Sequence, residues 1–187
     1  MRITGGVLKG KTLRVPPGII RPAMDRMRES VFAVLGDLSG ASFLDLFSGS
    51  GIISLEAASR GASPVEAVES DPLKRKILLD NTALAPVPVR CRFMSAELYI
   101  KRARRSFDYI FCDPPFAYGH KKELLLAIET SPLVSPGSLV LIHRPAPERL
   151  DRESFNSLGL RETRRYGSSA VDFFTPQRLS SGPAQPG

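Results

Sequence analysis

Cysteine is scarce in this chain of 187 residues, which contains only Cys91 and Cys112. Two thiols so far apart in sequence exclude a zinc ribbon and a disulfide framework. Both lie in apolar runs, so we expect buried core thiols without a functional role. The sequence therefore predicts no metal site.

Long apolar runs are missing as well: none approaches the ~18 residues of a membrane-spanning helix. Residues 1–14 are basic, but no apolar segment follows them that could act as a secretory signal. We therefore expect a cytoplasmic protein with no membrane partner. The length is sufficient for a single domain with a core of its own, and we expect a monomer.

Negative charge is sparse at the N-terminus. The chain has a net charge of +7, and residues 1–29 carry seven basic side chains against two acidic ones, whereas residues 30–142 carry twelve of each sign. A basic appendage on a neutral body favours a polyanionic partner, because clustered Lys and Arg release counterions from phosphates. The alternative is a solvated surface that only keeps the protein soluble.

Apolar runs alternate with helical stretches from residue 42 onward. Strands are predicted at residues 42–46, 64–69, 89–94, 107–112 and 138–143, and helices at residues 52–60, 72–84, 95–104 and 121–130. This alternation indicates a parallel sheet covered on both faces. Two final runs, 158–166 and 170–176, predict an antiparallel hairpin. The expected fold is α/β, Rossmann-like and doubly wound, with a mostly parallel seven-stranded sheet.

The N-terminal part reads differently. Two short runs, 1–4 and 12–15, are separated by glycines and predict a small basic β-hairpin. Asp25 is predicted to cap a helix whose apolar positions recur at helical spacing. The expected organisation is an N-terminal RNA-binding extension at residues 1–36, a catalytic domain at residues 37–178 and a disordered tail at residues 179–187.

A glycine loop follows the first predicted strand and reads Asp45-Leu46-Phe47-Ser48-Gly49-Ser50-Gly51. Its glycines allow a sharp turn and close approach of a ligand, and ligands of such sheets lie beyond the carboxyl ends of the strands. A dinucleotide loop would have glycine in place of Ser54. The Asp45 carboxylate suits an ammonium group and repels a pyrophosphate, which favours S-adenosylmethionine over another nucleotide.

Glu69 ends the second strand, the usual place for a carboxylate that accepts ribose hydroxyls, although alone it could be a surface acid. Ser95-Ala96-Glu97 follows the third strand, where an adenine contact is often found. Glu97 could instead simply begin a helix. The predicted cofactor-binding residues are Asp45, Phe47, Ser48, Gly49, Gly51, Glu69, Ser95 and Ala96.

The most specific signal is Asp113-Pro114-Pro115-Phe116, after the fourth strand. An exocyclic amine of a base is a poor nucleophile, because its lone pair is delocalised into the ring. Acceptors on Asp113 and the Pro114 carbonyl would rehybridise and orient that nitrogen. The prolines stiffen the loop, and Phe116 offers a face for an extruded base. We predict Asp113, Pro114 and Phe116 as catalytic residues. The alternative is a simple Pro-Pro turn with Phe116 in the core.

These motifs resemble a known family. D-L-F-S-G-S-G at 45–51, V-E-S-D at 68–71 and D-P-P-F at 113–116 are similar to the bacterial 16S ribosomal RNA (guanine-N2) methyltransferases that act on guanine 966, which are class I enzymes dependent on S-adenosylmethionine. The resemblance extends to R-I-T-G-G at 2–6 and D-R-M-R-E-S-V-F at 25–32. It covers nearly the whole chain apart from the tail.

The resemblance implies methylation of the N2 amine of a guanine in 16S ribosomal RNA, within the small ribosomal subunit or its assembly intermediate. It also implies contacts with RNA phosphates by Arg2, Lys9, Lys11, Arg21, Arg26 and Arg28. Two positions depart from the family pattern: Ser95 replaces the usual Asn or Asp, and His143 stands where members often carry an acid. We interpret His120 and His143 as bystanders.

Four other functions compete with this one. Adenine-N6 DNA methyltransferases can share the D-P-P-[YFW] motif, but the chain has no room for a separate target-recognition domain. Protein-glutamine methyltransferases normally have Asn in place of Asp113. A non-catalytic RNA-binding assembly factor on the same fold is disfavoured by the intact motifs. A nicotinamide oxidoreductase is disfavoured by Ser54.

Overall fold

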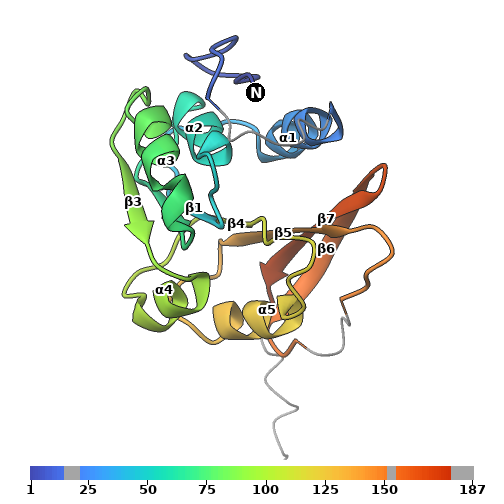
Figure 1. The fold of residues 1–187 in the computed structure, drawn as a ribbon. Coiled ribbons are helices and arrows are strands. Elements are labelled where there is room, and N and C mark those ends of the chain that lie inside the picture. The colour runs from blue at the N-terminus through green and yellow to red at the C-terminus, as the bar shows by residue number, and fades with distance from the viewer. Residues whose placement is uncertain (15–21, 151–154, 178–187) are drawn as a thin grey trace, which may run out of the picture.

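A seven-stranded sheet divides the molecule into two layers (Figure 1). The computed structural model describes residues 1–14, 22–150 and 155–177. The strand order is β3-β2-β1-β4-β5-β7-β6. Strands β1 to β5 pair in parallel, whereas β7 is antiparallel to β5 and β6. This arrangement confirms the predicted doubly wound α/β sheet with its C-terminal hairpin. The strands are β1 (Phe43–Leu46), β2 (Val65–Glu69), β3 (Val89–Phe93), β4 (Tyr109–Cys112), β5 (Leu139–Pro145), β6 (Leu158–Tyr166) and β7 (Ser169–Pro176).

Helices cover both faces of the sheet (Figure 1). The predicted helix at 72–84 divides into a 3₁₀ turn (Pro72–Lys74) and α3, and the Asp71 side chain caps the turn by accepting from Leu73 N at 2.9 Å. Within the described ranges, no helix is long and apolar enough to cross a membrane. On one face lie α1 (Pro22–Leu35), α2 (Ile52–Ser59) and α3 (Arg75–Thr82), and on the other α4 (Ala96–Arg102) and α5 (Lys121–Glu129).

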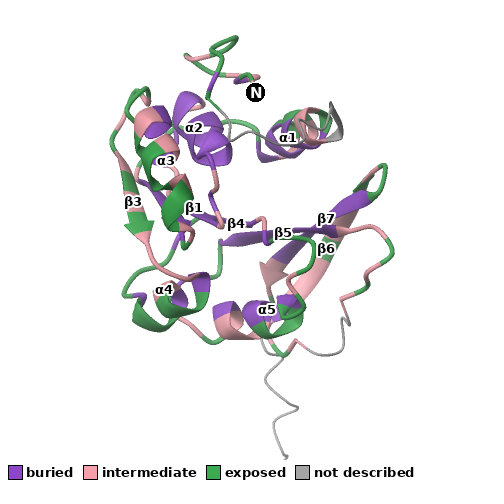
Figure 2. Ribbon diagram, viewed as in Figure 1, coloured by how far each residue is buried: buried purple, intermediate pink, exposed green. Residues whose placement is uncertain are grey.

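Each helix layer packs against alternate residues of the strands. Phe43, Val65 and Phe111 belong to the core cluster that also contains side chains of α1 and α2. Leu44 and Ile110 belong to the cluster that contains side chains of α4 and α5. All residues of β1 and β2 are buried, as Figure 2 shows for the centre of the sheet. A strand covered on both faces favours apolar side chains, which explains the largely apolar runs in the sequence.

The parallel register brings three loops to one edge of the sheet. Leu46, the last residue of β1, pairs with Val68 in β2 and with Cys112 in β4. The residues that follow these three positions therefore leave the sheet together, at its carboxyl edge. They are the glycine loop, Glu69 with the turn after it, and the loop that begins at Asp113.

Residues 1–14 form a looser pair than the predicted hairpin. Among the described residues of this segment, Arg2 and Thr12 form a single antiparallel bridge, and no strand is present. The pairing ends at Thr4, because its amide and hydroxyl donate to the Glu56 carboxylate in α2 at 2.8 and 2.6 Å. The antiparallel pairing of the predicted hairpin is therefore present, but it is shorter than two full strands, because backbone groups that would extend the ladder bind α2 instead.

The first helix also begins earlier than predicted. It starts at Pro22, and Asp25 lies in its first turn instead of capping it. Proline suits this position, because the first amides of a helix have no partner within it. Asp25 pairs instead with Arg28 at 3.0 Å. Arg21 and the predicted tail, residues 179–187, lie outside the described residues.

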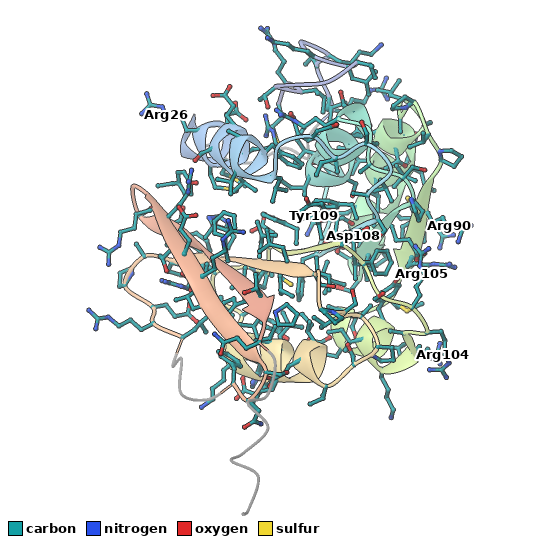
Figure 3. All side chains as sticks on the ribbon, turned by 180° about the vertical axis from the view of Figure 1, so that it is seen from behind. Arg26, Arg90, Arg104, Arg105, Asp108 and Tyr109 are labelled. Carbon is teal, nitrogen blue, oxygen red and sulfur yellow. The ribbon has the colours of Figure 1, made fainter. Side chains whose placement is uncertain are left out.

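Arg28 fastens the N-terminal segment to α2. Its side chain is 1% exposed, and its guanidinium donates to Glu56 Oε2 at 3.3 Å and to the Arg2 carbonyl at 2.5 Å. Glu56 is fully buried and also accepts from Arg60. The prediction that Arg28 contacts RNA phosphates is therefore wrong, because its guanidinium is buried and already paired. Arg26, two residues earlier, points away from the molecule (Figure 3).

The variant Arg28→Ala is expected to lower the free energy of unfolding by about 3 kcal/mol, because it removes one partner of a buried ion pair. Arg26→Ala is the matched control and should change it by less than about 0.5 kcal/mol, since Arg26 is exposed. Denaturant unfolding of both variants and the wild type measures this. Equal midpoints for the two variants would show that Arg28 does not hold the segment.

Candidate active site

A cavity of about 620 Å³ opens at the carboxyl edge of the sheet. Six of the predicted cofactor-binding and catalytic residues line it: Phe47, Gly49, Glu69, Asp113, Pro114 and Phe116. The three loops that the strand register brings to this edge thus share one cavity. The lining also contains residues that the sequence did not predict: Met24, Ser70, Asp71, Lys74, Pro115, His143, Ser168 and Ser169.

Glu69 joins two of the loops around the cavity. Its carboxylate accepts from the Gly49 amide at 2.7 Å and from the Asp71 amide at 2.8 Å. Lys74 Nζ lies 3.9 Å from it. These contacts fix the carboxylate, which is 5% exposed, while each oxygen retains a second lone pair for a donor. A ribose diol supplies two such donors, so the geometry suits the role predicted for Glu69.

Asp45 lies buried behind the glycine loop and outside the cavity lining. One carboxylate oxygen accepts from the Ser54 amide at 3.1 Å and hydroxyl at 2.6 Å, and the other has no partner among the residues that the structure describes. Burial raises the pKa of Asp45 to about 8, with further contributions from the charges of Asp113 and Glu69. The charges of Asp113 and Glu69 therefore reach Asp45, so the three acidic residues lie in one region of the site.

This region fits S-adenosylmethionine. The second oxygen of Asp45 is buried and not used by the described residues, and the space beside Gly49 is open where a side chain would stand. A positively charged ligand beside Asp45 favours the ionised form of this carboxyl, which burial disfavours. Gly49, with φ of 56°, holds a left-handed conformation that favours glycine. Phe47 adopts φ of 68° beside it, and its ring meets Tyr118 edge-on at 5.4 Å.

Besides Asp45, four other predicted cofactor residues stand outside the lining. The Ser48 hydroxyl donates to the Val68 carbonyl at 3.0 Å, which ties the glycine loop to β2. A side chain at Gly51 would meet Leu78, so this glycine permits close packing of α2 against α3. Ser95 caps α4 by accepting from the Leu98 amide at 3.2 Å, and Ala96 is buried. Their contact with the cofactor stays a prediction.

Asp113 is the first residue after β4 and directly precedes the two prolines of the loop. Its side chain is 24% exposed, and its amide donates to the Leu46 carbonyl at 3.2 Å. Pro114 is buried, which anchors the loop. Phe116 is 38% exposed, so the alternative that places its ring in the core is wrong. The acidic group and the aromatic face thus both border the cavity.

His143 is the residue that sequence reasoning missed. Its Nδ1 lies 2.8 Å from Asp113 Oδ1, and its ring meets Phe116 edge-on at 5.3 Å. An ionised carboxylate can only accept, so Nδ1 donates, and the other ring nitrogen is buried without a partner among the described residues. Strand neighbours carried the missing signal: Ile142 pairs with Cys112, so the next residues of β5 and β4 meet. His143 is therefore part of the site.

Comparison with known proteins agrees with this geometry. The family described as "Conserved hypothetical protein 95" matches residues 1–175. The chain belongs to this family. It is 33% identical to Ribosomal RNA small subunit methyltransferase D of Escherichia coli (strain K12) over 146 residues, which covers 76% of this chain and 73% of that protein.

Two further similarities bear on the site. The tRNA1(Val) (adenine(37)-N6)-methyltransferase of Shewanella amazonensis is 29% identical over 163 residues, 76% of this chain and 70% of that protein. The solved structure of the putative methyltransferase yhhF from Escherichia coli has 28% identity and a TM-score of 0.81, covering 95% of this chain and 98% of that one. The chain is thus a class I methyltransferase that depends on S-adenosylmethionine.

The variant Asp45→Asn is expected to remove a pH dependence of stability. The pKa of Asp45 in the fold, about 8, lies above its unfolded value of about 4. The neutral form of Asp45 is therefore favoured in the fold and adds to the free energy of unfolding. This contribution is fully present below about pH 4 and is lost as the pH rises through about 8. Relative to Asp45→Asn, the wild type should lose a few kcal/mol between pH 5 and 8.5. Thermal unfolding measures this, and parallel curves for both proteins would contradict it.

Replacement of His143 is expected to act through Asp113. His143→Ala removes the donor to Asp113 and should lower kcat about tenfold, with little change in KM, because the carboxylate loses its fixed orientation. His143→Asn places an amide donor near the position of Nδ1 and should restore most of kcat. Steady-state methyl transfer by the three proteins tests this. Equal losses in both variants would assign His143 a merely structural role.

Proposed function

We propose that this protein transfers a methyl group from S-adenosylmethionine to the exocyclic N2 amine of a guanine in 16S ribosomal RNA, within the small ribosomal subunit. One observation carries the proposal: Glu69, Asp113 and Phe116 border the same cavity. The sulfonium of the cofactor supplies an electrophilic methyl group. The nucleophile must therefore come from the substrate, on the side of Asp113.

The side of the cavity that Asp113, Pro114 and Phe116 line suits the planar amine of a base. A base that stacks on Phe116 gains about 1–3 kcal/mol. Its amine then donates to the Asp113 oxygen that His143 leaves unpaired, and the Pro114 carbonyl offers a second acceptor. These contacts localise the nitrogen lone pair and aim it along the line of transfer. The nitrogen loses a proton after transfer, and the linked pair Asp113 and His143 is the acceptor at hand.

The N-terminal segment and α1 supply contacts with RNA phosphates. Arg2, Lys9, Lys11 and Arg26 are exposed. Arg2 and Lys9 line a shallow cavity of about 570 Å³ on this part of the molecule. Met24 lines the catalytic cavity, so α1 connects the two regions. RNA that binds beside α1 can therefore place a base at Asp113.

Methylation of the N6 amine of adenine is the second candidate. The relative from Shewanella amazonensis, whose name states adenine N6, supports it. Asp113 and Pro114 offer acceptors to either amine, so the resemblance to the guanine-966 enzymes favours guanine. Small subunits from a strain lacking the enzyme, incubated with radiolabelled S-adenosylmethionine, should acquire label at one guanine. Label at an adenine would select the second candidate, and label on protein alone would overturn both.

Asp113→Asn is expected to lower kcat about a hundredfold or more, because the neutral amide accepts more weakly and cannot take a proton. Binding of S-adenosylmethionine should stay within about twofold of the wild type. Initial rates on small subunits and calorimetric titration with the cofactor measure the two effects. Turnover equal to that of the wild type would remove Asp113 from the reaction.

A further inference from the structure

A second concentration of positive charge lies on the other layer of the molecule. Residues 90–108 carry six basic side chains against two acidic ones, and all six are exposed. They come from β3, from the end of α4 and from the loop after it. Arg92 pairs in register with Val68, which belongs to the core under α4 and α5, whereas Ile3 of the N-terminal segment belongs to the core under α1 and α2.

Five arginines line one cleft of about 350 Å³. They are Arg90, Arg92, Arg102, Arg104 and Arg105. Figure 3 shows three of them along one edge of the molecule, on the other side from Arg26. We call this group the arginine cleft. It has no part in the catalytic cavity, with which it shares no lining residue.

A buried carboxylate orders the arginine cleft. Glu66 in β2 has a side chain that is 5% exposed. It accepts from Arg105 Nη2 at 2.8 Å, from Arg92 Nε at 3.3 Å and from the Tyr99 hydroxyl at 2.9 Å, and Arg90 Nη1 lies 4.0 Å away. One carboxylate offsets one positive charge. The other guanidiniums therefore remain uncompensated around it and keep N–H groups turned to solvent.

The arrangement matches phosphate chemistry. A guanidinium presents its N–H groups in a rigid fork that binds two oxygens of a phosphate at once, and a pre-ordered side chain loses less entropy on binding. Arg92 and Arg105 have side chains that are 46% and 40% exposed although they donate hydrogen bonds to Glu66, and Arg90, which is 62% exposed, lies within 4.0 Å of the same carboxylate. Such a dense group of cations on one short segment fits a polyanion better than a peptide with scattered acids.

We propose that the arginine cleft is a second phosphate-binding surface for the RNA substrate. The inference rests on the proposed function, because it takes ribosomal RNA as the polyanion. A small ribosomal subunit is much larger than this chain, so RNA around the target base extends past the catalytic cavity. The N-terminal segment then holds RNA on one layer of the enzyme, and the arginine cleft holds it on the other.

The double variant Arg102→Gln/Arg104→Gln tests the proposal, because neither residue contacts Glu66 and the scaffold stays intact. The matched control is Arg161→Gln/Arg165→Gln on β6, at the opposite edge of the sheet. The probes are deproteinised 16S ribosomal RNA and whole small subunits, both from a strain lacking the enzyme. Binding is measured from 50 to 300 mM salt without the cofactor.

The cleft variant should bind both probes about tenfold more weakly near 0.1 M salt. The slope of log K against log salt should fall by about 1.5, since each lost phosphate contact removes about 0.7–0.9. KM for small subunits should rise while kcat and cofactor affinity stay constant. The control variant should retain the wild-type slope.

Three results would overturn the proposal. A wild-type slope in the cleft variant would exclude phosphate contacts there. An equal loss in the control would assign the effect to net charge alone. Weaker binding to subunits but not to bare RNA would assign the cleft to an acidic ribosomal protein. Failure of the proposed function is distinguishable from failure of this proposal. It would appear as an absence of labelled RNA with the wild-type enzyme, whatever the salt dependence of binding.

Discussion

The parallel pairing of β1 with β2 on one side and with β4 on the other determines where the chemistry occurs. Because Leu46, Val68 and Cys112 lie in register, three loops far apart in sequence leave the sheet at one edge. Pairing also continues from β4 to β5, which adds His143 to the same edge. The backbone hydrogen bonds between the buried strands fix the spacing of the residues at this edge, so the strand register alone brings their side chains together.

Burial of an acidic group is the main electrostatic feature of this edge. It raises the pKa of Asp45, and the charges of Asp113 and Glu69 raise it further. Glu69 and Asp113 border the cavity that is the proposed site of a cofactor with a sulfonium and an ammonium group. Each acid is held differently. Glu69 accepts two backbone amides, Asp113 accepts from His143, and Asp45 keeps one oxygen unpartnered in the interior. The acidic groups of the site are therefore held in place by the fold itself.

Burial separates two kinds of arginine that look alike in sequence. Arg26 and Arg28 are two residues apart on α1, yet one is exposed and the other is buried against Glu56. A helix places residues two apart on different faces, so the same basic stretch serves both surface and core. Around Glu66 the acid is buried, whereas the arginines that surround it remain partly exposed to solvent.

The sequence by itself determined the fold and the main reactive groups. Strands buried on both faces are largely apolar, and the motifs at Asp45, Glu69 and Asp113 stand at or beside the carboxyl ends of such strands. Only the tertiary structure placed His143 against Asp113 and Arg28 against Glu56, and only it gathered the arginines of β3 and α4 into one cleft. Local patterns show which side chains are polar, whereas packing between distant segments decides which of them meet and which remain open to solvent.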